Sequence, residues 1–447
     1  MDVKMRHSMN LEKKIRRNMN SGILGKIKDL VLKHYLWVYA VYFIVMFLGT
    51  TTVGIDYPVL GRVIKSVKYV AYMLFVIRIL FILPEYKKAI FEDKWSHKPL
   101  LIKLAYIFII AMILGLTVNM VLTGNKRLLL VGLVVIAGFK IDYLKLFKLT
   151  LITQIILCST IVLLSSVDLL QNFPIARSQS KMMRYSLGFL YPTNLAQFVM
   201  ISSVIFMFFT RLKTKWRDLF IMQLINGLVY FITNSRTEFI VLETCIIIIA
   251  VIKLISNTGG KRAMEVIKRG FSKGFTYSFF TYPFISLAIV FQYPSGGIWR
   301  ELNKALSGRL SQTYNDIKMY GLKIFGVKFK MVGRGLDQKA TLEKMHNKSN
   351  YVDNEYIQMM FKEGVLVAVC FIALLTILLL VLLKLEKYRE ILLCAVFLLF
   401  GILNPRIIRL EYCPILLMFI PAMLEYGNRR RRDRTDEIMR PPTKKRV

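Results

Sequence analysis

Residues 294–356 read PSGGIWRELNKALSGRLSQTYNDIKMYGLKIFGVKFKMVGRGLDQKATLEKMHNKSNYVDNEY, and this stretch decides how the rest of the chain is interpreted. It is a long polar interval between two apolar runs, each long enough to cross a bilayer. From Trp299 to Leu310, apolar residues recur at helical spacing with basic residues between them. We therefore expect a large extracytoplasmic loop that carries short amphipathic helices.

The composition of the whole chain is that of a membrane protein. The chain has 447 residues, of which 55% are hydrophobic, and its mean hydropathy is +0.50. A soluble multidomain protein is excluded by values this high. The formal net charge of +36 comes from Lys and Arg residues placed between apolar runs and at both termini. Such residues report membrane topology, so we expect no nucleic-acid partner.

The apolar runs predict an all-α polytopic membrane protein with about twelve transmembrane helices. The expected spans are 36–53, 66–84, 100–122, 128–141, 148–166, 187–210, 218–233, 238–255, 275–293, 357–383, 391–404 and 410–426. The predicted regions are a basic N-terminus (1–35), helices one to nine (36–293), the loop (294–356), helices ten to twelve (357–426) and a basic tail (427–447). The fourth, seventh and eleventh spans are short, which tilting or a break would accommodate.

Basic residues concentrate on one side of this plan, which places both termini in the cytoplasm and the protein in the cell membrane. The expected external segments are 54–65, 123–127, 167–186, 234–237, 294–356 and 404–409. The five cysteines lie in or beside apolar runs without a CxxC pair, and the four histidines are scattered. We therefore expect no disulfide framework, no metal site and no cofactor.

Several arginines lie in or beside the expected external segments. They are Arg184, Arg236, Arg309, Arg406 and Arg409. Each one alone suits an interfacial anchor that holds helix depth. A guanidinium can also donate two parallel hydrogen bonds to two oxygens of a phosphate. Several arginines that converge from different loops would therefore bind a pyrophosphate. Beside Arg184, Pro192 is expected to open the helix, and Asn194 and Gln197 share a face there.

Asp353 and Glu355 are the external acids best placed for chemistry, at the threshold of the tenth expected span. An acid here is also favoured by helix capping and the helix dipole, and Asp353 suits the N-cap position. In a partly desolvated, arginine-rich cleft, the same carboxylate could accept a proton from a sugar hydroxyl. Both interpretations remain open at this level.

Four short motifs occur in a recognisable order. They are Ser307-Gly308-Arg309, Gly333-Arg334-Gly335, Asp353-Asn354-Glu355-Tyr356 and Glu363-Gly364. With RYSLGFLYPTNLA (184–196) and NSRT (234–237) upstream, the chain resembles the O-antigen ligase and polymerase superfamily, specifically the Wzy-type polysaccharide polymerases. Asp353 stands where ligase-type members carry a histidine, which favours a polymerase.

This resemblance implies a glycosyltransferase that needs neither metal nor nucleotide. Its donor would be a growing glycan on undecaprenyl pyrophosphate, and its acceptor the terminal hydroxyl of a lipid-linked repeat unit. The product would be capsular polysaccharide, exopolysaccharide or O-antigen. Expected partners are these glycans and membrane lipid, with a chain-length regulator and a flippase as further candidates.

On this resemblance the catalytic candidates are Asp353, Glu355 and Arg309. The candidate substrate-binding residues are Arg177, Arg184, Arg236, Arg406, Arg409, Asn194, Asn354 and Tyr356. Two alternatives remain, a glycan ligase of the same superfamily and a flippase or other transporter. A transporter is expected to carry charges deep in several spans and an internal repeat, whereas this chain gathers charges in one large loop.

Overall fold

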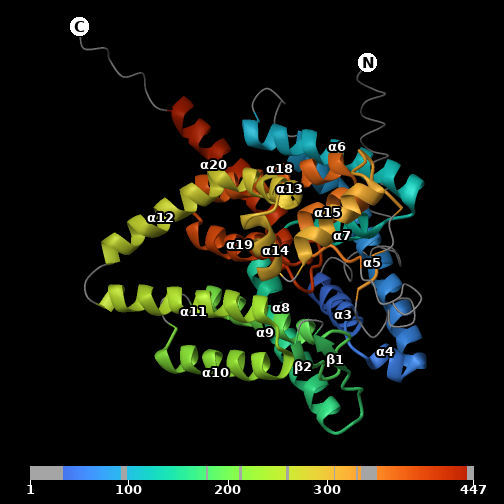
Figure 1. Ribbon diagram of the computed structural model, residues 1–447. Coiled ribbons are helices and arrows are strands. Elements are labelled where there is room, and N and C mark those ends of the chain that lie inside the picture. Colours follow the sequence, from blue (N-terminus) through green and yellow to red (C-terminus); the bar gives the residue numbers. More distant parts are fainter. Residues whose placement is uncertain are drawn as a thin grey trace.

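The computed structural model describes residues 34–91, 98–177, 180–210, 214–257, 261–306, 308–328, 331–333 and 350–439. These residues are predominantly helical (Figure 1), which confirms the predicted helical class. The departure from an all-α fold, within these ranges, is a two-stranded antiparallel hairpin. Most of the basic N-terminus, the end of the basic tail and much of the stretch 294–356 lie outside the described residues.

The first half of the chain forms helices joined by short connections, followed by the hairpin. Its elements are α3 (Tyr35–Leu48), α4 (Val53–Asp56), α5 (Pro58–Phe91), α6 (Leu100–Thr123), α7 (Arg127–Ala137), α8 (Tyr143–Ser166), β1 (Pro174–Arg177), β2 (Ser180–Tyr185) and α9 (Pro192–Thr210). Helix α9 begins at Pro192, so the expected span 187–210 starts later than predicted. Proline suits the first helical position because its missing N–H would be unpaired there anyway.

The second half is also helical, with several breaks. Its elements are α10 (Trp216–Thr233), α11 (Arg236–Asn257), α12 (Lys261–Ser278), η3 (Phe279–Thr281), α13 (Tyr282–Gln292), η4 (Tyr293–Ser295), α14 (Ile298–Ala305), α15 (Arg309–Tyr320), α17 (Glu355–Lys362), α18 (Val365–Lys384), α19 (Tyr388–Phe400), η6 (Pro414–Met418) and α20 (Phe419–Met439).

Six helical stretches within the described residues are long and apolar enough to cross a membrane. They are Pro58–Lys87, Leu100–Thr123, Tyr143–Ser166, Pro192–Thr210, Glu265–Ser295 and Val365–Lys384. Two shorter apolar helices, Tyr35–Leu48 and Arg127–Ala137, lie among them. The structure therefore supports a multi-pass membrane protein, and the count of twelve spans stays a prediction.

Helix α18 lies at the centre of the bundle. It packs against α6, α12, α19 and α20. Of its most apolar 18-residue part, 72% is buried inside the protein. Its sequence, VLVAVCFIALLTILLLVLLK, is apolar on every side, as expected for a helix enclosed by other helices. Because α17 leads directly into α18, the residues at the start of α17 are held on a rigid support.

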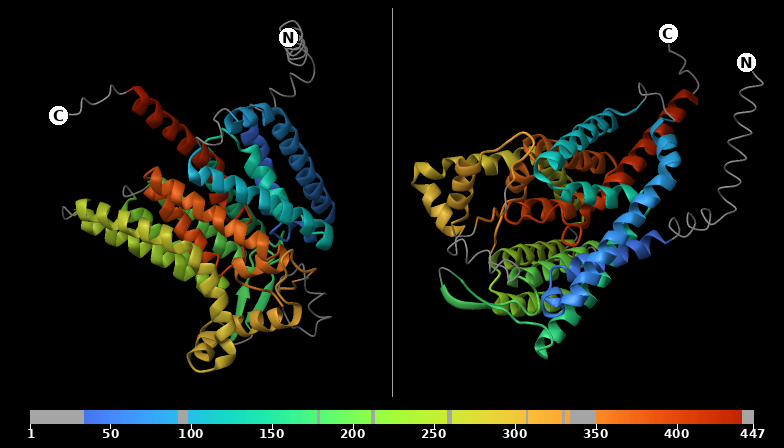
Figure 2. Two further views of the ribbon diagram at one scale, coloured as in Figure 1. Left: turned by 90° about the horizontal axis from the view of Figure 1, so that it is seen from above. Right: turned by 90° about the vertical axis from the view of Figure 1, so that its right-hand side faces the viewer.

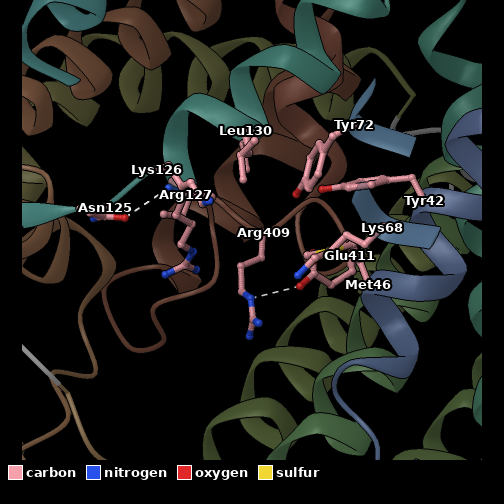
Figure 3. A pocket seen from close by; sticks show the side chains of 13 residues that line it. Tyr42, Met46, Lys68, Tyr72, Asn125, Lys126, Arg127, Leu130, Arg409 and Glu411 are labelled. Carbon is pink, nitrogen blue, oxygen red and sulfur yellow. Dashed lines mark hydrogen bonds and ion pairs between the residues drawn. The ribbon is translucent and has the colours of Figure 1, made fainter. Parts of the chain in front are cut away.

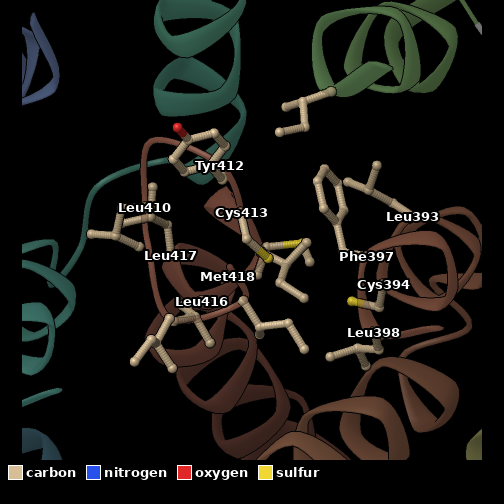
Figure 4. Close-up of a cluster of buried hydrophobic side chains, with 14 of the residues drawn as sticks. Leu393, Cys394, Phe397, Leu398, Leu410, Tyr412, Cys413, Leu416, Leu417 and Met418 are labelled. Carbon is tan, nitrogen blue, oxygen red and sulfur yellow. The ribbon is translucent and has the colours of Figure 1, made fainter. Parts of the chain in front are cut away.

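The chain after α19 differs from the prediction. Residues 410–426 were expected to form one span, but residues 401–413 contain no helix, η6 follows, and α20 begins only at Phe419. Pro405 and Pro414 interrupt helical hydrogen bonding here. Irregular backbone is tolerated at membrane depth where protein surrounds it, and Leu410 and Cys413 are almost fully buried. Figure 4 shows Cys413 and residues of η6 in one cluster with Phe397, Cys394 and other side chains of α19.

We call residues 401–413 the buried segment. It includes Asn404 to Arg409, which were expected to form a short external loop. Ile407 and Ile408 are each only 2% exposed, so this part of the chain lies inside the protein. Arg406 and Arg409 flank these isoleucines and are themselves half-buried, with both guanidinium groups over the Tyr412 ring.

A second, smaller core lies beneath the described parts of the stretch 294–356. Its buried residues are Val290, Leu310, Met331, Val352, Ile357 and Phe361, and Leu302 of α14 packs against them. Figure 2 shows α14 and the hairpin β1–β2 at one end of the molecule, with the C-terminal end of α20 at the other. This core fixes the position of Asp353, which directly follows Val352.

Candidate functional site

Arg309 and Asp353 form an ion pair, 2.8 Å from Nε to Oδ2. Arg309 is the first residue of α15 and follows Gly308, whose φ of +83° is easily adopted by glycine. Its Nη1 also donates a hydrogen bond to the Leu403 carbonyl at 3.2 Å. About a third of each side chain is exposed, so the pair remains open to a ligand. Two sequence motifs and the buried segment thus meet at one place.

The charges around Asp353 come from three other parts of the chain. Burial raises the pKa of the Asp353 carboxyl, while the positive charges of Arg309 and Arg406 oppose that increase. The negative charge of Glu238 raises the same pKa further. Asp353 therefore lies within electrostatic reach of α15, α11 and the buried segment.

Glu238, in the first turn of α11, was not singled out from the sequence. It is 3% exposed, and its Oε1 accepts hydrogen bonds from Gln197 at 3.0 Å and from Asn404 at 3.2 Å. These bonds connect α9, α11 and the buried segment. The signal that could have revealed Glu238 is its position at membrane depth, two residues after Arg236, because buried acids there are costly and need partners.

Arg406 presents an unused donor at this site. Its guanidinium carbon lies 4.2 Å from the centre of the Tyr412 ring, and that ring stacks on Phe198 with 4.6 Å between centroids. Its Nη1 is buried and has no hydrogen-bond partner among the described residues. A buried guanidinium N–H without a partner carries a desolvation cost that an anionic ligand would relieve.

Three of the expected site residues have structural roles in α17. Asn354, not Asp353, is the N-cap, because its side chain accepts a hydrogen bond from the Ile357 N–H. Glu355 accepts one from the Ile407 N–H at 2.8 Å. The Tyr356 hydroxyl donates to the Leu398 carbonyl at 2.8 Å. All three are buried. Glu355 and Tyr356 hold α17 against the buried segment and α19, and Asn354 also donates to the Ser286 hydroxyl of α13.

The upstream motifs meet as well. Arg184 of β2 donates from Nε to the Thr233 carbonyl at 2.8 Å and from Nη2 to the Ser235 hydroxyl at 3.2 Å. These bonds tie the hairpin to the turn between α10 and α11, where Asn234 adopts a φ of +47°. Asn194 is buried and donates to the Thr50 carbonyl at 3.0 Å.

The remaining expected residues do not take part in the Arg309–Asp353 ion pair or lie outside the described residues. Arg236 is exposed at the start of α11. Arg409 lines a cavity, considered below, and packs on the same Tyr412 ring as Arg406. The side chain of Arg177, Ser307 and the residues Arg334 and Gly335 lie outside the described part of the chain.

Replacing Arg184 by Ala should lower the free energy of unfolding by about 1–3 kcal/mol, because two hydrogen bonds from a charged donor are lost. Arg184→Lys should lie between Ala and wild type, since an ammonium cannot reproduce the guanidinium fork. Arg236→Ala, at an exposed position close by, should change stability by no more than about 0.5 kcal/mol. Thermal unfolding in detergent measures the stability of all three variants. Unchanged melting of Arg184→Ala together with lost activity would instead assign Arg184 to ligand binding.

Comparisons of the chain with protein-family models, with curated protein sequences and with solved structures give no match.

Proposed function

We propose that this protein is a glycosyltransferase that polymerises undecaprenyl-pyrophosphate-linked repeat units at the outer face of the cell membrane. The observation that supports this most is the Arg309–Asp353 ion pair beside Arg406, whose buried Nη1 has no partner among the described residues. The site thus combines a carboxylate with two guanidinium groups. Glycosyl transfer from a pyrophosphate leaving group needs a base for the acceptor hydroxyl and cations for the leaving group, and these side chains provide both.

In the proposed reaction, a hydroxyl oxygen of the acceptor sugar attacks the anomeric carbon of the donor glycan. The bond from that carbon to the pyrophosphate oxygen breaks, and the pyrophosphate leaves with the electron pair. Asp353 accepts the hydroxyl proton, while Arg309 and Arg406 stabilise the negative charge that develops on the leaving group. Glu238, Gln197 and Asn404 form a hydrogen-bonded group that fixes the walls of the site.

Loss of the protein from its host tests this proposal. Single lipid-linked repeat units should accumulate at the outer face of the membrane, and polymer ladders should disappear. Accumulation at the inner face would indicate a flippase instead. If polymer of normal length still forms but is not transferred to its final acceptor, the protein is a ligase.

The orientation of the chain is a further part of the proposal. We expect a cysteine at Met319, in α15, to react with an impermeant thiol reagent added to intact cells. One at Arg217, at the start of α10, should react only after permeabilisation. Both positions have exposed side chains, so accessibility within the protein does not limit labelling. Reversed labelling would place the Arg309–Asp353 pair in the cytoplasm and overturn the proposed reaction.

A further inference from the structure

A cavity of about 370 Å³ is lined by neither Arg309 nor Asp353. It adjoins their site through Tyr412, because Arg409 of the cavity and Arg406 both pack on that ring. Its walls come from α3, α5, the connection from α6 to α7, the start of α7 and the buried segment. Figure 3 shows side chains from these elements around a common space. Its volume lies within the range of small-molecule sites. No residue of this cavity except Arg409 was singled out from the sequence.

The cavity is strongly basic. Lys68, Lys126, Arg127 and Arg409 line it, against one acid, Glu411. Arg127 is also the first residue of α7, whose eleven residues add the positive end of a helix dipole. Four cations in one cavity repel each other, which an anionic ligand with several oxygens would offset.

Glu411 supplies an independent sign of a ligand. It is 1% exposed, and neither of its carboxylate oxygens has a hydrogen-bond partner among the described residues. Arg409 Nε lies 3.1 Å from Oε1, which is an ion-pair distance, but the geometry does not make a hydrogen bond. A buried carboxylate in this state is costly unless a donor on a ligand satisfies it.

The position of Lys68 indicates what kind of anion would enter. Lys68 lies on α5, which is long and apolar enough to span a membrane. Its neighbours Tyr69, Val70 and Met73 are all exposed on the surface of the protein. In a membrane protein such residues face lipid. The rim of the cavity therefore borders hydrocarbon, which suits an anion attached to a lipid tail.

We propose that this cavity binds the phosphate-bearing headgroup of a lipid. Lys68, Lys126, Arg127 and Arg409 bind the phosphate oxygens, and Glu411 accepts a hydrogen bond from a hydroxyl of the headgroup. None of these residues belongs to the Arg309–Asp353 ion pair. Assignment to a phospholipid does not depend on the reaction proposed there, whereas assignment to a polyprenyl carrier rests on the proposed function. The phosphate could belong to a membrane phospholipid or to a polyprenyl carrier, and the probes below separate the two.

Binding is measured by calorimetry on the full chain in a maltoside detergent, with the substitutions Arg309→Gln and Arg406→Gln present throughout to remove cations of the other site. The probes are dioctanoyl phosphatidylglycerol, farnesyl pyrophosphate, inorganic pyrophosphate and uncharged dioctanoylglycerol. At least one phosphorylated amphiphile should bind, and dioctanoylglycerol should not. Tighter binding of farnesyl pyrophosphate would identify a polyprenyl carrier, and tighter binding of phosphatidylglycerol a phospholipid. Equal binding of inorganic pyrophosphate and the amphiphiles would overturn the lipid assignment.

Variants locate the site. Lys68→Gln and Arg127→Gln should each weaken binding by about tenfold, as expected for loss of one charged hydrogen bond. Lys65→Gln, an exposed position one turn earlier on α5, is the matched control and should bind like the parent. Glu411→Gln should bind farnesyl pyrophosphate more tightly, because a repelling charge is removed and this probe has no alcohol hydroxyl for Glu411 to accept from. That gain cannot result from misfolding. Equal weakening by Lys65→Gln, or no change in the two cavity variants, would refute the proposal.

Discussion

Replacing Asp353 by Asn should lower the rate of glycan transfer by about 10²–10⁴-fold, the loss typical of removing a general base. Asn has nearly the same size as Asp but cannot accept the hydroxyl proton. The protein should still fold, because Asn354 and not Asp353 caps α17. The ion pair with Arg309 is about one-third exposed and contributes only about 0–1 kcal/mol to stability. Polymer ladders, normalised to the amount of protein in the membrane, measure the effect.

The pH dependence gives this prediction a second readout. A base acts only when deprotonated, so activity should rise with pH as Asp353 loses its proton. Because burial raises the pKa of Asp353, that rise should occur above the usual range of an aspartate. The rising limb should disappear in Asp353→Asn. A variant that keeps both normal ladders and the rising limb would remove Asp353 from the mechanism.

Glu355→Gln is the control for Asp353→Asn. Its carboxylate accepts a hydrogen bond from the Ile407 N–H and is almost completely buried. We expect this change to act on the position of the buried segment and on thermal stability, with ladders reduced in proportion to the folded protein that remains. A loss of activity at full stability would instead assign the base to Glu355.

Replacing Gly364 by Ala should destabilise the protein by about 3 kcal/mol or more, enough to deplete folded protein in the membrane. A Cβ at Gly364 would lie 2.3 Å from the Ile324 carbonyl oxygen and 2.5 Å from the Gly326 nitrogen. The φ of Gly364 is +100°, a conformation that other residues adopt only with strain. Neither contact involves a flexible side chain, so the backbone itself would have to move.

This close approach joins the stretch 294–356 to the central helix. The Val365 N–H donates to the Lys323 carbonyl at 3.0 Å, and the Val327 N–H donates to the Phe361 carbonyl at 2.8 Å. Separating these two segments of the chain would therefore also displace α17, which begins two residues after Asp353. We expect Gly364→Ala to lose activity together with folded protein.

Gly132→Ala is the matched control. Gly132 lies inside α7, and nothing lies within 4 Å of the position its Cβ would take. Because alanine favours a helix more than glycine, this change should be neutral or stabilise by about 0.5–1 kcal/mol. Fluorescence-detected size exclusion and thermal melting compare the two variants. Wild-type melting of Gly364→Ala would contradict the close approach.

Part of the site could be predicted from the sequence because polar residues in an apolar chain are conspicuous. Arg309 and Asp353 were selected separately, and the structure pairs them across 44 positions of sequence. The roles of Asn354, Glu355 and Tyr356 could not be assigned, because each depends on a partner in the Ser286 region, the buried segment or α19. The N-cap of α17 in particular is Asn354, one residue after the predicted Asp353. Only the backbone geometry decides between these two neighbours.

The sequence by itself determined that this protein is helical and lies in a membrane, because the length and composition of each apolar run depend on no other part of the chain. Only the tertiary structure decided that residues 401–413 are buried, that Glu238 bonds to Asn404, and that Lys68, Arg127 and Glu411 share a cavity. The physical reason is that these contacts join residues far apart in sequence. They exist only where packed helices bring their side chains within a few ångströms, which no local pattern of residues records.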